Sequence, residues 1–201
     1  MFSKPLKHKL ASHFKAPLRQ KDLARHASGI IKETRYSVVP NFINELKSSG
    51  VINSHKLSAK NNKTATLYSS LPAKEIDPYD MAMAVCPQGY FCNLSSIFYH
   101  SLTNQIPSSI YICNETISSK QKSKIDGLTN SKIRNAFIKP HRYTNYVFEF
   151  NNYEIVVVDR KRKARHGVQQ VNSSNKLLPL NSQVTGIERA LIDAVVSPQY
   201  N

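Results

Sequence analysis

One stretch of the sequence has the residue types of a metal-dependent nuclease of the restriction type. The run IVVVDRK places Asp159 and Lys161, two residues apart, at the end of an apolar segment. Such nucleases combine an acidic residue and a lysine at this spacing with a second carboxylate, so that a divalent metal is held and water is activated. Asp126, Glu149 or Glu154 would have to supply that carboxylate. Because Asp-x-Lys is a common tripeptide and no Pro-Asp pair precedes it, a nuclease remains an alternative that metal-dependent cleavage would reveal.

Other patterns typical of catalysis are absent from the sequence. The six Gly form no phosphate-binding loop, and no Gly-x-Ser-x-Gly motif occurs. The seven His are scattered, and His100 is expected to be packed or hydrogen-bonded. Cys86, Cys92 and Cys113 contain no Cys-x-x-Cys pair and are expected to be buried, reduced thiols of a cytoplasmic protein. We therefore predict a protein with no enzyme activity, no cofactor and no metal.

The charge of the chain indicates a polyanionic partner. The sequence has 28 Lys and Arg against 13 Asp and Glu, a formal net charge of +15. Residues 1–75 hold 14 of these basic residues and only 4 of the acidic ones, so most of the excess lies there. Nucleic acid is the usual partner of such a surface. The longest aliphatic run, residues 155–158, is too short to span a membrane, and no apolar segment follows the basic N-terminus as in a secretory signal.

Local signals predict the elements that would present these charges. Residues 5–14 and 18–27 suit two short helices separated by Pro17. A third helix is expected to begin with Ser37 as its N-cap and to end at the glycine of SSGV. Pro40 then falls in the first turn, where its missing N–H costs nothing.

Two β-compatible runs, VINSHKLSA and TATLYSS, follow on either side of the turn sequence KNNK. The order of two helices, a turn, a helix and a basic hairpin is typical of a winged helix-turn-helix. We therefore predict such a DNA-binding domain in residues 1–70. If this module does not bind DNA, the alternative is a protein–protein interaction module of a phage-defence system.

The predicted DNA contacts follow from this arrangement. The third helix would enter the major groove with its N-terminal end, and the hairpin lysines would lie on the adjacent phosphate backbone. The DNA-binding set is Arg19, Lys21, Lys32, Arg35, Tyr36, Ser37, Asn41, Lys60 and Lys63. A basic run in the second half of the chain is expected to be a solvated loop with additional contacts from Arg160, Lys161, Arg162, Lys163 and Arg165.

Residues 71–201 show a different pattern, which predicts a mixed α/β domain with an antiparallel hairpin, so that the whole chain is of the α+β class. The runs RYTNYVFEF and YEIVVVD are expected to pair across Asn151 and Asn152. The segment SKIRNAFIK suits either a strand or a helix. We also expect short helices in PYDMAMAVCP and NLSSIFYHSLTNQIP, and strands in SSIYICN and GVQQV.

The segment TGIERALIDAVVSP is expected to form a complete helix near the end of the chain. Thr185 and Glu188 have the spacing of a capping box, and Arg189 can pair with Asp193 one turn later. Its apolar stripe includes Leu191 and is expected to be buried against the hairpin of residues 142–158.

Several of these segments, in this order, resemble the AbiEi family, the antitoxins of type IV toxin–antitoxin systems. The family's first helical motif corresponds to GYFCNLSSIFYHSLTNQIP, which is followed by a strand like SIYICN. Its later T-x-x-ERTLID…P motif corresponds to Thr185, Glu188–Asp193 and Pro198. The chain departs from the family at Ser101, where the family has glycine, and at Ala190, where it has threonine.

The resemblance implies a winged helix followed by an α+β antitoxin domain, and by this comparison the chain is expected to lack the family's C-terminal part. It implies a transcriptional repressor that binds inverted repeats of double-stranded DNA in its own promoter and acts in abortive infection. It also implies a cognate nucleotidyltransferase-like toxin that is opposed without a stable complex. The operator sequence, the toxin and the oligomeric state do not follow from the sequence.

Overall fold

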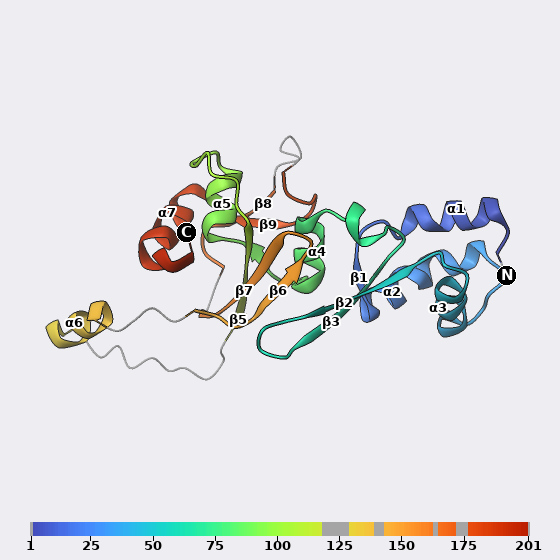
Figure 1. Cartoon of the computed structure of the whole chain (residues 1–201), viewed down its shortest axis with the longest axis horizontal. Helices are drawn as coiled ribbons and strands as arrows, with labels where there is room; N and C mark the ends of the chain where they lie inside the picture. The colour runs from blue at the N-terminus through green and yellow to red at the C-terminus, as the bar shows by residue number, and fades with distance from the viewer. Residues whose placement is uncertain (1, 118–128, 139–142, 163–164, 172–176, 201) are drawn as a thin grey trace.

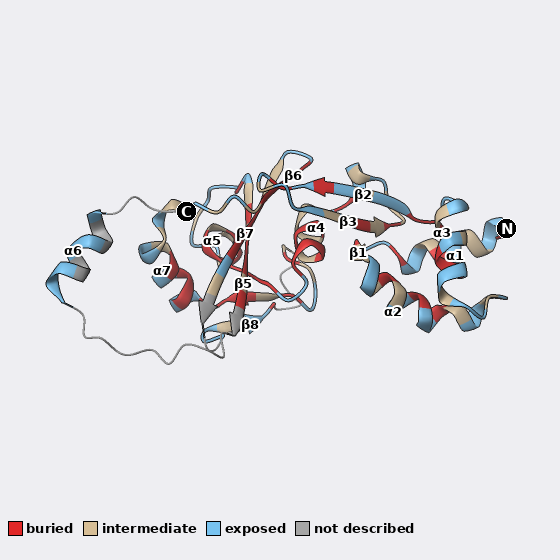
Figure 2. Ribbon diagram, turned by 90° about the horizontal axis from the view of Figure 1, so that it is seen from below, coloured by how far each residue is buried: buried red, intermediate tan, exposed pale blue. Residues whose placement is uncertain are grey.

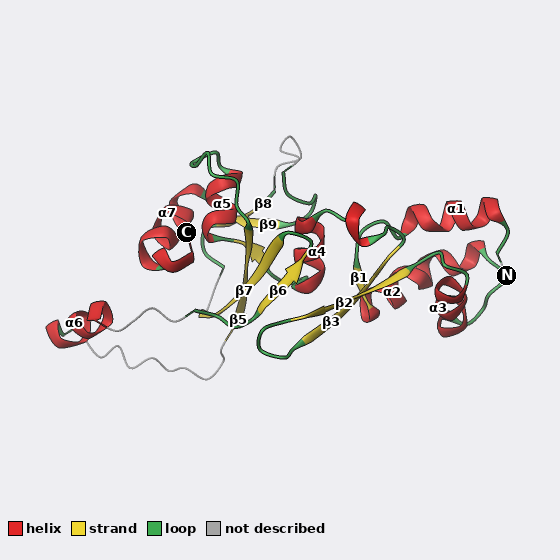
Figure 3. Ribbon diagram, in the orientation of Figure 1, coloured by secondary structure: helices red, strands yellow, loops and turns green. Residues whose placement is uncertain are grey.

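The computed structural model describes residues 2–117, 129–138, 143–162, 165–171 and 177–200 (Figure 1). The protein is of mixed α+β type and has two sheets. The three-stranded sheet and its helices lie at one end of the molecule, and the six-stranded sheet lies beyond them (Figure 3). No helix within the described ranges has the length and apolar character needed to cross a membrane.

The N-terminal part contains the predicted helices and hairpin, except that Leu18 and Arg19 form a short strand, so the second helix begins at Gln20 and not at residue 18. Its strands form an antiparallel sheet in the order β1-β3-β2. The elements are α1 (Lys4–His13), β1 (Leu18–Arg19), α2 (Gln20–Ile30), the 3-10 helix η1 (Ile31–Glu33), α3 (Val39–Ser48), β2 (Asn53–Ser58) and β3 (Thr64–Ser69).

Helix α3 forms where the sequence predicts it, with one correction. Pro40 lies in the first turn, as expected, and the turn between β2 and β3 contains Asn62 with a positive φ of 63°. The residue at the N-cap is Val38, whose side chain makes no cap hydrogen bond. The predicted cap by Ser37 is therefore wrong, since the chain enters the helix one residue later. Inside the helix, Phe42 and Leu46 are fully buried and fix α3 against α1 and α2.

The second sheet has the order β6-β7-β5-β4-β9-β8 and mixes parallel and antiparallel pairs. The predicted hairpin is confirmed, because β6 and β7 are antiparallel neighbours joined at Asn151, whose φ is 53°. The segment left open between strand and helix forms α6 (Asn130–Ile138). The other elements are η2 (Ala73–Glu75), α4 (Pro78–Val85), β4 (Tyr90–Phe91), α5 (Asn93–Tyr99), β5 (Ser109–Ile117), β6 (Val147–Phe150), β7 (Tyr153–Arg162), β8 (Val168–Gln170), β9 (Gln183–Thr185), α7 (Ile187–Val196) and η3 (Pro198–Tyr200).

The β2–β3 hairpin belongs to both parts of the molecule. Its outer end extends away from α3 and reaches the second sheet (Figure 1). There Ala59 forms an isolated bridge with Phe148 of β6, and Leu57 and Leu67 join the larger apolar core of the second sheet. The core beneath the N-terminal helices is a separate cluster. The predicted domain boundary after residue 70 thus lies directly after a hairpin that packs on the second sheet.

Helix α7 has the opposite orientation to the one predicted. Leu191 is 51% exposed, and the remaining large apolar residues of the helix are exposed as well: Ile187, Ile192, Val195 and Val196. Arg189, Ala190 and Asp193 are the buried residues, on the side that packs against α5 (Figure 2). The expected burial of Leu191 against residues 142–158 is therefore wrong. Tyr200, just after the helix, packs on that hairpin instead, beside Val147, Val156 and Val158.

The predicted capping box of α7 is also wrong. Thr185 is the last residue of β9 and pairs with Val168 of β8, so the N-cap is Gly186. The Thr185 hydroxyl is buried and has no hydrogen-bond partner among the residues that the structure describes. His100 is hydrogen-bonded as predicted: its Nε2 lies 2.7 Å from the carbonyl oxygen of Thr185, which can only accept.

Candidate functional site

The first cluster of predicted DNA-binding residues lies at the start of α3. Lys32, Arg35, Ser37 and Asn41 are exposed there, while Tyr36 is half-buried. The ring of Tyr36 packs edge-on against Phe2 and lies 5.7 Å from the Arg35 guanidinium carbon. This packing fixes the segment before α3. Five of the nine predicted residues thus lie in the short segment of residues 32–41, and four of these five are exposed.

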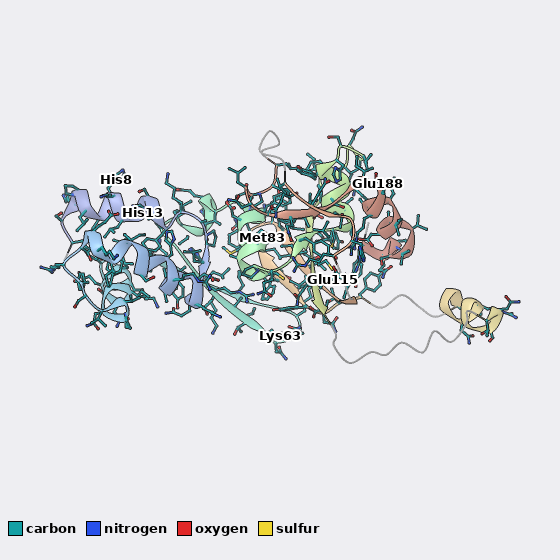
Figure 4. All side chains as sticks on the ribbon, turned by 180° about the vertical axis from the view of Figure 1, so that it is seen from behind. His8, His13, Lys63, Met83, Glu115 and Glu188 are labelled. Carbon is teal, nitrogen blue, oxygen red and sulfur yellow. The ribbon has the colours of Figure 1, made fainter. Side chains whose placement is uncertain are left out.

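The two hairpin lysines lie apart from this cluster. Figure 4 shows Lys63 at the outer end of the β2–β3 hairpin, beside the second sheet and far from α3. Its Nζ is 4.5 Å from the centre of the Tyr146 ring. Lys60 Nζ is 2.7 Å from Glu154 Oε1, and the hydrogen bond to Glu154 and its charge raise the pKa of Lys60. Both lysines remain exposed, but phosphate must compete with Glu154 for Lys60.

Arg19 and Lys21 occupy a third place, a cleft between α2 and the second sheet. The cleft has a volume of about 660 Å³, and Arg25 also lines it. Arg19 is half-buried, and its Nε donates to the carbonyl oxygen of Ala84 at 3.0 Å. Burial raises the pKa of the Cys86 thiol in this cleft to about 11, although the positive charge of Arg19 opposes the rise. This thiol is therefore protonated at neutral pH.

Arg160 is not part of a solvated loop. It lies in β7, and its side chain is 12% exposed. Its guanidinium donates to Asp193 Oδ1 at 2.7 Å and to Asn93 Oδ1 at 3.1 Å. Burial alone would lower the pKa of Arg160, but Cys92 and Asp193 outweigh it and leave the pKa above its ordinary value. The predicted solvent contact of Arg160 is therefore wrong, because the side chain is bound inside the protein.

Arg189 extends this buried network. Its Nη2 donates to the Tyr90 hydroxyl at 2.6 Å and lies 3.7 Å from Glu115 Oε1. Its Nε lies 3.7 Å from Asp193 Oδ2, so the predicted pair within α7 is present. The Tyr90 hydroxyl in turn donates to Glu115 Oε2 at 3.2 Å. Two arginines and two carboxylates thus hold α7 against β4, β5 and β7. Every residue of the network has a protein partner, and the network connects α7 to the sheet.

The remaining basic residues of this region have varied positions. Arg165 is exposed, and its guanidinium donates to Gln183 Oε1 at 2.8 Å and to the carbonyl oxygen of Gln88. Lys161 and Arg162 are the last residues of β7. Lys163 lies outside the described residues.

The carboxylates considered for a nuclease do not gather around Asp159. Glu149 and Glu154 face each other in the β6–β7 register, five residues before Asp159 on β7, which corresponds to about 16 Å along the strand. Asp159 itself accepts a hydrogen bond from Asn114 at 2.8 Å. Asp126 lies outside the described residues. Within the described part of the chain, no three His, Cys, Asp or Glu residues lie close enough to hold a metal ion.

Sequence reasoning missed the cleft and the buried network. Arg25 is not in the predicted DNA-binding set, and it pairs with Asp22 at 3.0 Å. The neutral wall of the cleft comes from residues between Val85 and Val157, far from α2 in the chain. Only long-range pairing brings them together, and no local signal could have indicated it.

A comparison of the chain with models of known protein families and with curated proteins finds no match.

Proposed function

We propose that the protein is a cytoplasmic, DNA-binding transcriptional repressor and antitoxin of AbiEi type. The observation that carries the DNA-binding part is the exposed cluster at the start of α3. There Arg35, Ser37 and Asn41 are exposed at or just before the N-terminus of a ten-residue helix whose N-cap residue, Val38, makes no side-chain cap hydrogen bond. Free N–H groups and the helix dipole favour phosphate at such an end, and the neighbouring cations add to the attraction.

The proposed DNA-binding domain is a winged helix-turn-helix in residues 1–70. Its support is the element order α1, β1, α2, α3, β2, β3 together with a sheet order of β1-β3-β2. In this proposal α3 enters the major groove of operator DNA, and Lys63 contacts the phosphate backbone. Asn41 is an exposed amide on the first turn of α3, and an amide side chain can form two hydrogen bonds with adenine.

The antitoxin part of the proposal rests on the resemblance of the second half of the chain to the AbiEi motifs. Arg189 and Asp193, which match the family's ERxLID motif, have a structural role here because they hold α7 in place. The proposed partner is a nucleotidyltransferase-like toxin that forms no stable complex with this chain. Co-expression with the product of the adjacent open reading frame tests this: relief of toxicity without co-purification is expected. A neighbour that is not toxic, or no relief, would contradict the antitoxin role.

Two substitutions distinguish a residue that recognises the bases of the operator from a residue that contacts only the phosphate backbone. Asn41→Ala should reduce the preference for operator over random DNA about 5- to 150-fold, because a base contact contributes about 1–3 kcal/mol of discrimination. Lys63→Ala should weaken binding to both DNAs by the same factor, because a phosphate contact carries no sequence information. Fluorescence anisotropy with an operator duplex, selected from the promoter region of the gene, and a shuffled duplex measures both.

The control is Lys74→Ala, an exposed lysine of η2 outside the predicted set, which should bind both duplexes like the unmodified protein. Equal losses for Asn41→Ala on operator and shuffled DNA would show that α3 does not read bases. A chain that binds neither duplex would point to the interaction module instead.

A further inference from the structure

The cleft beside α2 has two walls of different chemistry. One wall carries three cations, Arg19, Lys21 and Arg25, from β1 and the first two turns of α2. Asp22 is the only carboxylate among the residues that line the cleft, and it is paired with Arg25. The lining therefore has an excess of two positive charges, which Asp159 beside the cleft lowers to one, and this excess favours an anion such as a phosphate monoester.

The opposite wall is neutral and comes from the second sheet and the end of α4. Gln88 and Asn114 contribute amide groups, and Tyr146 contributes part of an aromatic ring. Asp159 is exposed beside this wall, and its Oδ1 accepts a hydrogen bond from Asn114 at 2.8 Å, which orients the amide. Amides can donate to and accept from the edge of a nucleobase, and aromatic rings contact its face. These groups can recognise the uncharged end of a ligand whose other end carries the negative charge.

The cleft also has the volume of a ligand site, and the residue between its two walls, Arg19, is held in place. Its volume of about 660 Å³ falls within the range of small-molecule pockets, about 300–1,000 Å³. Arg19 is fixed on one side by strand pairing of β1 with β3 and on the other by its bond to the carbonyl oxygen of Ala84. The cationic wall is therefore joined directly to α4 of the second wall.

We propose that this cleft binds a nucleoside monophosphate, with the phosphate at Lys21 and Arg25 and the base against Tyr146 and Asn114. The site lies apart from the proposed DNA-binding surface at α3, although Arg19 and Lys21 also belong to the predicted DNA-binding set. The charge of the cleft alone would also attract other anions, and the amide and aromatic groups make the ligand a nucleotide.

Isothermal titration calorimetry of the full chain with 5′-AMP tests this proposal. We expect saturable binding with one site per chain, and adenosine and inorganic phosphate should each bind at least about tenfold more weakly. Lys21→Ala and Arg25→Ala should each weaken AMP binding about tenfold or more, as for a lost hydrogen bond to a charged group. Both side chains are exposed, so equal thermal midpoints of variants and unmodified protein will show that the fold is retained.

Lys74→Ala is the matched control and should bind AMP like the unmodified protein. The proposal is overturned if AMP does not bind at millimolar concentration, or if the Lys21 and Arg25 variants bind it unchanged. It is also overturned if inorganic phosphate binds as tightly as AMP, because the neutral wall would then recognise nothing. An equal loss in Lys74→Ala would show attraction by net charge alone. DNA binding by Asn41→Ala is measured separately, so failure of one proposal leaves the other intact.

Discussion

Asp193→Asn should lower the free energy of unfolding by about 3–5 kcal/mol. Asp193 is the carboxylate that faces both Arg160 and Arg189, and its side chain is 1% exposed. Asparagine has nearly the same volume but no charge, so two buried guanidinium groups would lose their shared counter-charge. Removing one partner of a buried ion pair typically costs this much, because the remaining charge stays out of water. Chemical denaturation followed by circular dichroism measures the change.

Leu191→Ala is the matched control on the same helix. Leu191 is 51% exposed and lies on the outer side of α7, so its removal should change stability by no more than about 0.5 kcal/mol. Combining Asp193→Asn with Arg160→Met should cost less than the sum of the two single changes, because the partners are coupled. A large loss for Leu191→Ala with a small one for Asp193→Asn would mean that α7 packs through its apolar side.

Affinity for DNA should fall about 150-fold when the salt concentration rises from about 50 to 200 mM. The estimate assumes four phosphate contacts, from Lys32, Arg35, Lys60 and Lys63, each of which contributes about −0.9 to the slope of log affinity against log salt. The physical reason is that each contact releases a counterion condensed on the duplex. Anisotropy titrations with a random-sequence duplex at several salt concentrations give the slope.

The double variant Lys32→Ala, Arg35→Ala should halve that slope to about −1.8, so that the same salt change costs only about 12-fold. Lys74→Ala should leave the slope unchanged. An affinity that is independent of salt would rule out the electrostatic basis of the proposal. An unchanged slope in the double variant would place the contact surface away from α3.

The elements near the N-terminus were predictable because their signals are local. Pro40 and Asn62 determine a first turn and a hairpin turn through their own backbone preferences, and α3 and the β2–β3 hairpin form accordingly. The contact of the hairpin with the second sheet was not predictable from these signals. Its contact with β6, through Ala59 and Phe148, joins residues 89 positions apart, and nothing near the KNNK turn indicates it.

The end of the chain shows how long-range pairing overrides a local signal. Thr185 has the spacing of a helix cap, yet β9 runs between β4 and β8 and takes Thr185 into the sheet. Arg160 stands in a basic run that is typical of a solvated loop. Its partners Asp193 and Asn93 are 33 and 67 residues away, and only the assembled sheet brings them together. The sequence therefore indicates which residues are charged, but not which of the charges are buried.

The orientation of α7 reverses the usual pattern of evolutionary constraint on a helix. In most helices the apolar positions are held constant by the core, while charged positions drift. Here substitution at Arg189 or Asp193 disrupts a buried network, whereas Ile187, Leu191 and Val195 are exposed and contribute little to folding. Homologues of this chain should therefore retain the two charged residues and vary at the three aliphatic ones. Aliphatic positions that are nevertheless invariant would be under selection for something other than the stability of this fold.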